Sequence, residues 1–213
     1  MNTDTPKFLL ASSSPYRAAM LRQLGIAFDV ASPNIDESPL CTELPAHLAL
    51  RLSQQKAQSL VSNYAEHIII ASDQVACIAG THAPLGKPLS ITNAIAQLTR
   101  CSGRVVDFYT GLSVILPDSI CAPRQCEKQH TLVEKFSVEF RTLSHAQIEA
   151  YVHAEQPLDC AGSFKAEGLG IALFQGFSGR DYNTLIGLPL MALVDTLNRF
   201  GIDVLQSATY QQQ

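Results

Sequence analysis

The apolar positions of the chain form two kinds of pattern: short continuous or alternating runs, and longer segments with helical spacing. Runs that are rich in isoleucine, valine and phenylalanine but too short for a helix predict strands. These runs cover residues 7–12, 28–32, 67–73, 75–80, 104–116, 131–143 and 169–174. The run at 75–80 can pair with the run at 67–73 as a hairpin, and the two long runs at 104–116 and 131–143 look antiparallel.

Segments with helical spacing begin at serine or proline and end near glycine or a polar stretch, as helices commonly do. They cover residues 14–25, 45–64, 90–101, 144–152 and 189–201. The stretch at 117–129 is polar and contains two prolines, which predicts a solvent-exposed hairpin end. Residues 207–213 are expected to form a frayed tail.

Helices alternate with strands in the first half of the chain, whereas long consecutive strands dominate the middle. This order predicts an α/β fold with a mixed, partly antiparallel sheet flanked by helices, rather than a doubly wound parallel sheet. The chain shows no internal repeat or low-complexity linker. We therefore expect residues 1–213 to form a single domain with two lobes around a cleft.

Composition narrows the class of protein. With 213 residues and 46% hydrophobic content, the chain can bury a sizeable core. No apolar run approaches the ~20 residues of a membrane span, and the N-terminus lacks an export signal, so we expect a soluble, cytoplasmic protein with no membrane association. A net charge of −4 with dispersed basic residues argues against binding to a nucleic-acid polymer.

Cysteine and histidine spacing excludes another class of site. The six cysteines contain no CxxC pair, and the six histidines are dispersed. We expect reduced thiols, mostly in the core, and no transition-metal site.

The junction between the first strand and the first helix has unusual chemistry. A helix that starts at Ser14 directly after a strand leaves unpaired amides and a positive dipole end, which together suit an anion, above all a phosphate. Ser12, Ser13 and Ser14 add hydroxyl donors, and Arg17 adds a cation that opposes the dipole unless an anion is bound. Plain helix capping by one serine is the alternative interpretation.

A lysine interrupts the apolar arc of the helix after Pro45. Helical spacing places Leu48, Ala49 and Leu52 on one arc with Lys56 near its middle. A snorkelling lysine, whose stem packs while its ammonium reaches water, would explain this position. The functional alternative is that the core face opens there into an anion-lined cleft.

Carboxylates form the third group of candidates. Asp73 directly follows the apolar run at 67–72, and Asp36 and Glu37 lie in an irregular loop that could face the same cleft. A capping or turn role is the ordinary interpretation for Asp73. Mg²⁺ is commonly held by one or two carboxylates plus substrate phosphates. Together with the anion donors and Lys56, these acids suit metal-assisted attack on a phosphate chain.

An ordered series of motifs along nearly the whole chain resembles one known family. The motifs are "LLASSSPYR", "LGIAFDVASPNIDES", "RLSQQKAQSL", "IIIASDQV", "GKPLS", "VVDFYTGL", "CAGSFKAEGLG" and "TLIGLPL". In this series the chain resembles the Maf (septum formation inhibitor) proteins, which are nucleoside triphosphate pyrophosphatases. The resemblance implies a Maf/ITPase-like fold with a nucleotide-binding cleft, a divalent metal cofactor (Mg²⁺ or Mn²⁺), a house-cleaning role in nucleotide metabolism and a homodimer.

The resemblance also implies roles for individual residues. Arg17 matches the phosphate-binding arginine, Lys56 and Lys87 match two cleft lysines, Glu37 matches the loop carboxylate that holds the metal, and Asp73 matches the proton acceptor, also placed at the metal. Ser12 and Ser14 join the phosphate site as donors. Lys87 rests mainly on the resemblance, because a lysine between glycine and proline is ordinarily a surface turn residue.

Three further positions distinguish branches of the family. Here they are Tyr16, Gln74 and Glu167, and the chain is most similar to the branch that hydrolyses 7-methyl-GTP, which has an aromatic residue, glutamine and glutamate. The dTTP and UTP branch has arginine, threonine and glutamine. The chain departs from the first branch in Tyr16, where tryptophan is expected, and Ala18, where arginine is usual. A methylated guanine is cationic, so an aromatic face and a carboxylate suit it. The ordinary alternatives are that Tyr16 is a surface aromatic residue at the helix start and that Glu167 is an acid in a loop. For the function, the alternatives are a dTTP and UTP pyrophosphatase and a non-catalytic regulator of cell division.

Overall fold

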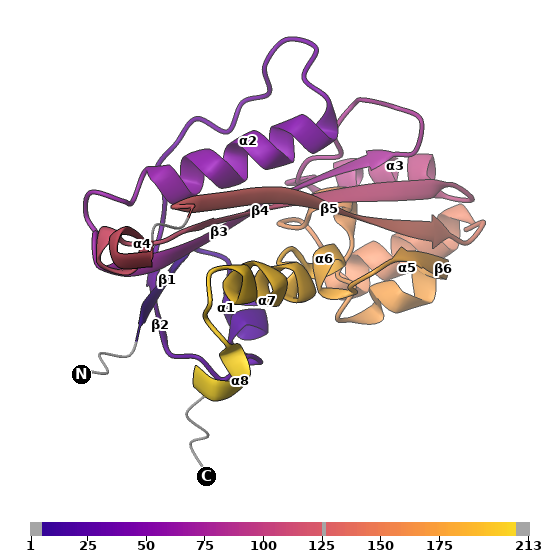
Figure 1. Ribbon diagram of the computed structural model, residues 1–213. Coiled ribbons are helices and arrows are strands. Elements are labelled where there is room, and N and C mark those ends of the chain that lie inside the picture. The colour runs from indigo at the N-terminus through magenta and orange to yellow at the C-terminus, as the bar shows by residue number, and fades with distance from the viewer. Residues whose placement is uncertain (1–5, 125–126, 208–213) are drawn as a thin grey trace.

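The computed structural model describes residues 6–124 and 127–207, which form a six-stranded sheet with helices on both faces (Figure 1). The strands are β1 (Lys7–Ala11), β2 (Phe28–Ala31), β3 (His67–Ile78), β4 (Val105–Ile115), β5 (Gln129–Phe140) and β6 (Phe174–Gly179). The helices are α1 (Pro15–Arg22), α2 (Pro45–Gln58), α3 (Ile91–Cys101), α4 (Asp118–Arg124), α5 (His145–Glu155), α6 (Asn183–Ile186), α7 (Leu190–Arg199) and α8 (Val204–Ser207). Two 3₁₀ helices are η1 (Ala161–Ser163) and η2 (Leu169–Leu173).

The sheet has a parallel part and an antiparallel part. Its strand order is β2-β1-β3-β4-β5-β6, in which β1 pairs in parallel with β2 and β3, and every later pair is antiparallel. The expected mixed, partly antiparallel α/β fold is therefore confirmed. Strand β1 ends at Ala11, but β3 continues from its last pairing with β1 at Ile70 as far as Ile78. The sheet thus has a step beside the middle of β3.

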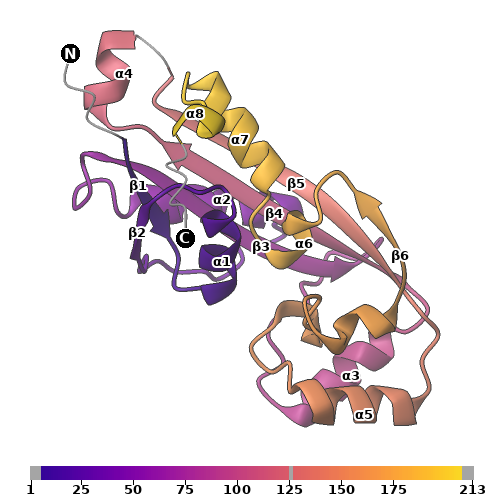
Figure 2. The same ribbon diagram turned by 90° about the horizontal axis from the view of Figure 1, so that it is seen from below.

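Helix α2 covers one face of the sheet. Gly111 on β4 permits its close approach, because a Cβ atom at Gly111 would lie 2.2 Å from the carbonyl oxygen of Ala49. The other face carries two separate cores. One joins β1 and β3 to α1 and α7 through Leu10, Leu21 and Leu193, and the other joins the far ends of β3, β4 and β5 to α3 and α5. Figure 2 shows α3 and α5 gathered at the end of the long strands, away from α1, as expected for two lobes.

Two expectations about strands are wrong, and the expected hairpin end at 117–129, which does join the antiparallel strands β4 and β5, also contains a helix. Residues 75–78 continue β3 instead of turning back as a hairpin, because this part of β3 pairs with β4 along its whole length. The 117–129 stretch contains helix α4, whose Cys121 is buried in the core. The apolar run at 169–174 forms η2, which leaves Leu169 and Ile171 exposed, and only Phe174 belongs to a strand.

Several boundaries also differ. Helix α2 ends at Gln58 and is followed by turns. Helix α5 continues past Val152 and ends at Glu155, because Gln156 adopts a left-handed conformation. Of the described cysteines, Cys77, Cys101 and Cys121 are buried, Cys160 is half-buried and Cys41 is exposed. Cys126 and the tail at 208–213 lie outside the described residues. The single-domain assignment of residues 1–213 stays a prediction.

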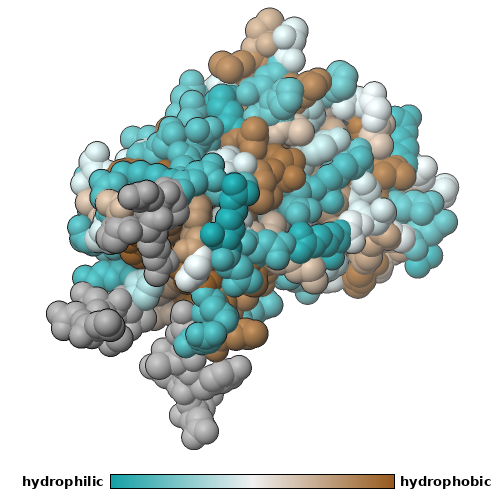
Figure 3. Space-filling view, viewed as in Figure 1, coloured by the Kyte–Doolittle hydropathy of each residue, from teal (hydrophilic) through white to brown (hydrophobic). Residues whose placement is uncertain are grey.

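The surface is largely polar. Figure 3 shows hydrophilic residues over most of one face, with hydrophobic residues in small groups among them. Within residues 6–124 and 127–207, no helix has the length and apolar character that crossing a membrane requires.

Candidate functional site

A cavity of about 370 Å³ lies beside the step in the sheet, between β1, β3 and the segment that contains η1. Ten of the residues that the sequence analysis singled out for a site line it. They are Ser12, Ser14, Tyr16, Arg17, Glu37, Lys56, Asp73, Gln74, Lys87 and Glu167. The expected position of Asp73 needs correction, because it lies in the middle of β3 and not at a strand end. It reaches the cavity because β1, the neighbouring strand, has already stopped.

The junction of β1 and α1 supplies hydrogen-bond donors to one part of the cavity. Ser14 caps α1 by accepting a bond from the Arg17 backbone N–H at 3.4 Å, as expected for a serine before proline. Ser12 Oγ accepts two bonds, from the Ser14 N–H at 3.1 Å and from Arg17 Nη1 at 3.3 Å. Both bonds use Ser12 as an acceptor, so its hydroxyl proton can be donated to a ligand.

The guanidinium of Arg17 is fixed from a second direction. Its Nε donates to the carbonyl oxygen of Gly187 at 2.9 Å, and Ser72 Oγ donates to the same oxygen at 2.8 Å. Gly187 has φ 117°, a conformation that favours glycine. Desolvation lowers the pKa of Arg17, and the nearby carboxylates of Asp73 and Glu37 oppose that shift. The arginine is thus oriented before any ligand binds.

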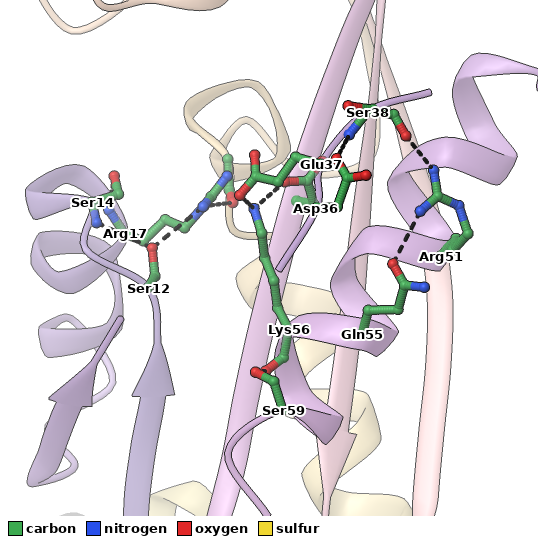
Figure 4. Close-up of polar contacts among 12 residues, drawn as sticks. Ser12, Ser14, Arg17, Asp36, Glu37, Ser38, Arg51, Gln55, Lys56 and Ser59 are labelled. Atoms are coloured by element: carbon green, nitrogen blue, oxygen red, sulfur yellow. Dashed lines mark hydrogen bonds and ion pairs between the residues drawn. The ribbon is translucent and has the colours of Figure 1, made fainter. Parts of the chain in front are cut away.

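Lys56 lies at the centre of the charged part of the cavity. Its side chain is only 7% exposed, and its Nζ contacts Asp73 Oδ1 at 2.5 Å and Glu37 Oε1 at 2.8 Å (Figure 4). The core-facing position is confirmed, and the ammonium stays between carboxylates instead of snorkelling to bulk water. Burial raises the pKa of Asp73 despite the neighbouring cations of Lys56 and Arg17. We call the set Ser12, Arg17, Glu37, Lys56 and Asp73 the charged end.

An arginine on α2 holds the loop that carries Glu37. Arg51 donates to the carbonyl oxygen of Ser38 at 3.1 Å and binds both carboxylate oxygens of Glu43 at 2.7 Å. These bonds lower the pKa of Glu43 to about 2. Asp36 does not line the cavity, contrary to expectation, because its carboxylate accepts a bond from the Ser38 N–H at 2.9 Å.

A second group of residues that line the cavity is aromatic, polar and acidic. We call it the aromatic end, and it consists of Tyr16, Gln74, Phe108, Phe164 and Glu167. Burial raises the pKa of Tyr16, and so do the nearby acidic groups of Cys160, Asp159 and Glu167. The carboxylates of Asp159 and Glu167 thus line the same cavity as the Tyr16 ring. Lys87 lines the cavity as an exposed residue.

Two carboxylates of the charged end fit a divalent cation. Among the described residues, no group of three or more histidine, cysteine, aspartate or glutamate side chains could hold a metal on its own. Asp73 and Glu37 nevertheless converge on one point, because both contact the Lys56 ammonium. Mg²⁺ typically needs only one or two protein carboxylates when substrate phosphates supply further ligands. The donor set therefore fits such a metal together with a phosphate-bearing ligand.

The mixed sheet and the charged cavity beside its step define an α/β protein with a small-molecule site. A family model described as "Maf-like protein" matches residues 7–200, and the chain therefore belongs to the Maf-like family. This membership makes it a nucleotide pyrophosphatase, a hydrolase.

Three solved structures are similar to the chain at low identity. The Ham1 protein of Staphylococcus aureus is 15% identical with a TM-score of 0.44, and the match covers 77% of this chain and 89% of that one. A nucleoside-triphosphatase, or dITP/XTP pyrophosphatase, from Mycobacterium abscessus is 17% identical with a TM-score of 0.39, covering 78% and 96%. A HAM1 protein from Coxiella burnetii is 14% identical with a TM-score of 0.43, covering 76% and 88%.

Sequence reasoning missed the residues that orient the site. Ser72 and Thr110 are completely buried hydroxyls on β3 and β4, and both bond to backbone carbonyls around α6. Arg51 was not distinguished from an ordinary surface arginine. A hydroxyl at the centre of a strongly apolar strand was the available indication for Ser72, because a buried polar group requires a partner.

Proposed function

We propose that the protein hydrolyses 7-methyl-GTP to 7-methyl-GMP and pyrophosphate, cutting between the α- and β-phosphates. One observation carries this proposal: a single cavity joins the charged end, which suits a triphosphate, to the aromatic end, which suits a cationic base. The family supports the pyrophosphatase class, and the residues of the aromatic end support the choice of base.

At the charged end, the proposed roles follow from charge and position. Arg17, Lys56 and Lys87 would bind and neutralise the phosphates, and most of the rate enhancement would come from this electrostatic contribution. Ser12 and the capped start of α1 at Ser14 add hydrogen-bond donors. Asp73 would accept the proton of the attacking water, since Lys56 contacts its Oδ1 and Oδ2 can face the water.

Glu37 and Asp73 would hold the divalent metal. When bound, Mg²⁺ or Mn²⁺ lowers the pKa of coordinated water and neutralises phosphate charge. The Lys56 ammonium contacts both carboxylates, so it compensates their negative charges in the ligand-free protein. Arg51 keeps Glu37 in reach by fixing Ser38, the next residue of the loop.

At the aromatic end, Tyr16 and Glu167 would recognise the methylated guanine. N7 methylation gives the base a positive charge, which is attracted to an aromatic face and to nearby carboxylates. The acidic surroundings of Tyr16 favour this assignment over the dTTP and UTP alternative. The chain retains all five residues that match the catalytic positions of the family, which argues against a purely binding regulator. They are Arg17, Glu37, Lys56, Asp73 and Lys87.

Pyrophosphate release from a nucleotide panel, with and without Mg²⁺ or Mn²⁺, tests the proposal. We expect the highest kcat/KM for 7-methyl-GTP and little turnover without metal. A higher kcat/KM for dTTP or UTP would reverse the substrate choice, and no release from any nucleotide would support the regulator instead. The homodimer and the cytoplasmic location stay predictions, which solution mass and fractionation measurements can check.

A further inference from the structure

The side chain of Gln74 is held by three partners, two on α6 and one on β4. Its Nε2 lies 2.8 Å from the Thr184 carbonyl oxygen, 3.0 Å from the Leu185 carbonyl oxygen and 3.1 Å from Thr110 Oγ1. Thr110 stands directly opposite Gln74 in the pairing of β3 with β4 and is 0% exposed. The half-buried amide is thus anchored before a ligand arrives.

The chemistry of these partners fixes which end of the amide faces them. The two backbone carbonyls can only accept hydrogen bonds. Thr110 Oγ1 lies 2.8 Å from the Thr184 carbonyl, and only the hydroxyl can be the donor in that contact. Its oxygen is left to accept from Gln74. Only the NH₂ group fits among three acceptors, with one of its two N–H bonds shared between two of them, so the carbonyl oxygen Oε1 turns the other way, toward the cavity that Gln74 lines.

We propose that Thr110 is a positioning residue that holds Gln74 with an acceptor toward the ligand, so that the site selects nucleobases with an N–H at that point. Guanine offers such an N–H at N1, and uracil and thymine offer one at N3. Adenine N1 and cytosine N3 are acceptors and would meet Oε1 unpaired. The proposal rests on the proposed function only in requiring a nucleotide, and it holds equally for 7-methyl-GTP and for dTTP or UTP.

The surroundings make this selection strong. Phe108, Phe164 and Leu185 line the same part of the cavity, so a polar group that finds no partner there is poorly compensated by water. Placing two acceptors against each other leaves both without a partner, and sites built to bond one polar edge reject the analogue that lacks it. The orientation of one amide would then separate two classes of base.

Hydrogen exchange of the Gln74 side-chain amide tests the orientation without any substrate. In the ligand-free protein we expect its NH₂ resonances, assigned by their loss in Gln74→Met, to exchange about 10-fold or more slowly than those of exposed Gln147. Thr110→Val removes one partner with little change of shape, and we expect it to speed that exchange. Thr110→Ser keeps the hydroxyl and should preserve slow exchange.

Kinetics test the consequence for base choice. We expect kcat/KM to favour GTP over ATP and UTP over CTP in the unaltered protein, and these ratios to fall about 5- to 30-fold in Thr110→Val, the effect of one lost partner of a half-buried amide. Thr110→Ser should restore them. Thr196→Val is the matched control, because Thr196 is equally buried and its hydroxyl bonds only within α7, to Ala192.

The outcomes separate this proposal from the substrate assignment. Rapid exchange of the Gln74 amide in the unaltered protein overturns the positioning role even if Thr110→Val does not fold. Ratios that are unchanged in Thr110→Val, or that fall as much in Thr196→Val, also overturn it. Preference for UTP over both CTP and 7-methyl-GTP would remove the 7-methyl-GTP assignment and leave the role of Thr110 supported.

Discussion

The charged end and the aromatic end of the cavity are organised in different ways. At the charged end, Lys56 binds two carboxylates, and Arg17 is held by Ser12 and by the Gly187 carbonyl. At the aromatic end, among the described residues, Glu167 forms no hydrogen bond or ion pair, and it is exposed like a surface residue. In the proposed complex, fixed charges would face the phosphates, whereas the base would meet the anchored Gln74 amide and, in Glu167, a side chain that a ligand must still order.

This difference separates two kinds of variant. A change of Lys56 or Asp73 at the charged end disturbs a buried, compensated ion pair, so it should affect both catalysis and the free energy of unfolding. A change of Tyr16 or Glu167 removes contacts made mainly with the ligand, so it should affect selectivity with little change in stability. The four predictions that follow test this comparison.

The largest effect is expected for Asp73→Asn. The amide keeps the size of the side chain but cannot accept the proton, so kcat should fall by at least ~100-fold. Burial raises the pKa of Asp73, so in the unaltered enzyme kcat/KM should fall with acid at a pH above the ordinary carboxyl value of 3.8. Steady-state pyrophosphate release as a function of pH measures both.

A matched control for Asp73→Asn is Asp107→Asn. Asp107 is also a buried aspartate bound to a lysine, Lys135 at 2.9 Å, but it lies outside the cavity. The Asp107→Asn variant should have a lower free energy of unfolding and the same kcat as the unaltered protein. Near-normal kcat in folded Asp73→Asn would refute the proton-acceptor role and remove the catalytic distinction between the two ends.

Lys56→Met should have the next largest effect. It removes a cation from the phosphate site, and we expect kcat/KM to fall by about 10- to 100-fold. It also leaves Asp73 buried without its nearest cation, which should lower the free energy of unfolding by roughly 3 kcal/mol. Denaturant unfolding measures the stability, and the double variant Lys56→Met with Asp73→Asn should recover part of it.

Lys135→Met provides the comparison for Lys56→Met. It breaks another lysine–aspartate contact, on the same face of the sheet, and should leave kcat/KM unchanged. Equal kinetic losses in the two variants would mean that Lys56 acts only through stability.

The residues of the site also differ in how well the sequence predicts them. Lys56 could be recognised because helical spacing exposed the conflict between a charge and an apolar arc, and that pattern depends on one helix alone. The partners that orient Arg17 and Gln74 could not be recognised in this way. Gly187 and Thr184 lie more than a hundred residues along the chain from Arg17 and Gln74, so only the folded topology brings them together.

The same limit explains the errors in the fold. Alternation and length predicted the long strands β4 and β5, whose pairing partners are neighbours in the chain. The short, apolar run at 169–174 predicts a strand, but Gly170 allows a turn in which a Cβ would lie 2.2 Å from the Lys165 carbonyl oxygen. The continuation of β3 past Asp73 depends on β4, which no local pattern at 75–80 reveals.

At the aromatic end, Tyr16→Ala should change selectivity more than rate. Loss of a cation–π contact worth roughly 0.5–2 kcal/mol should lower the preference for 7-methyl-GTP over GTP by about 2- to 30-fold. Glu167→Gln should lower that preference further, because the amide no longer attracts the methylated ring. Competition assays with the two nucleotides measure the ratio, and Tyr64→Ala, outside the cavity, serves as control. Unaltered selectivity in both variants would show that Tyr16 and Glu167 do not recognise the base.

The smallest effect is expected in the loop that carries Glu37, where the charged end reaches the surface. Bonds from Arg51 lower the pKa of Glu43 from its ordinary 4.5 to about 2. A carboxyl whose pKa is lowered on folding contributes stability above pH 4.5, and this contribution is lost as pH falls toward 2. Glu43→Gln should therefore lower the free energy of unfolding near pH 7 by about 0.2–1 kcal/mol, the range for ion pairs near the surface.

The pH dependence distinguishes this ion pair from a simple loss of packing. Denaturant unfolding of Glu43→Gln and the unaltered protein should give curves that differ at pH 7 and converge near pH 2. A difference that persists unchanged at pH 2 would show that the Glu43 carboxylate does not contribute through its charge. Because Arg51 also fixes Ser38 beside Glu37, Glu43→Gln should raise the Mg²⁺ concentration needed for half-maximal turnover by only about 2-fold. A similar change in Tyr16→Ala would show that the two ends are coupled more closely than their separate contacts indicate.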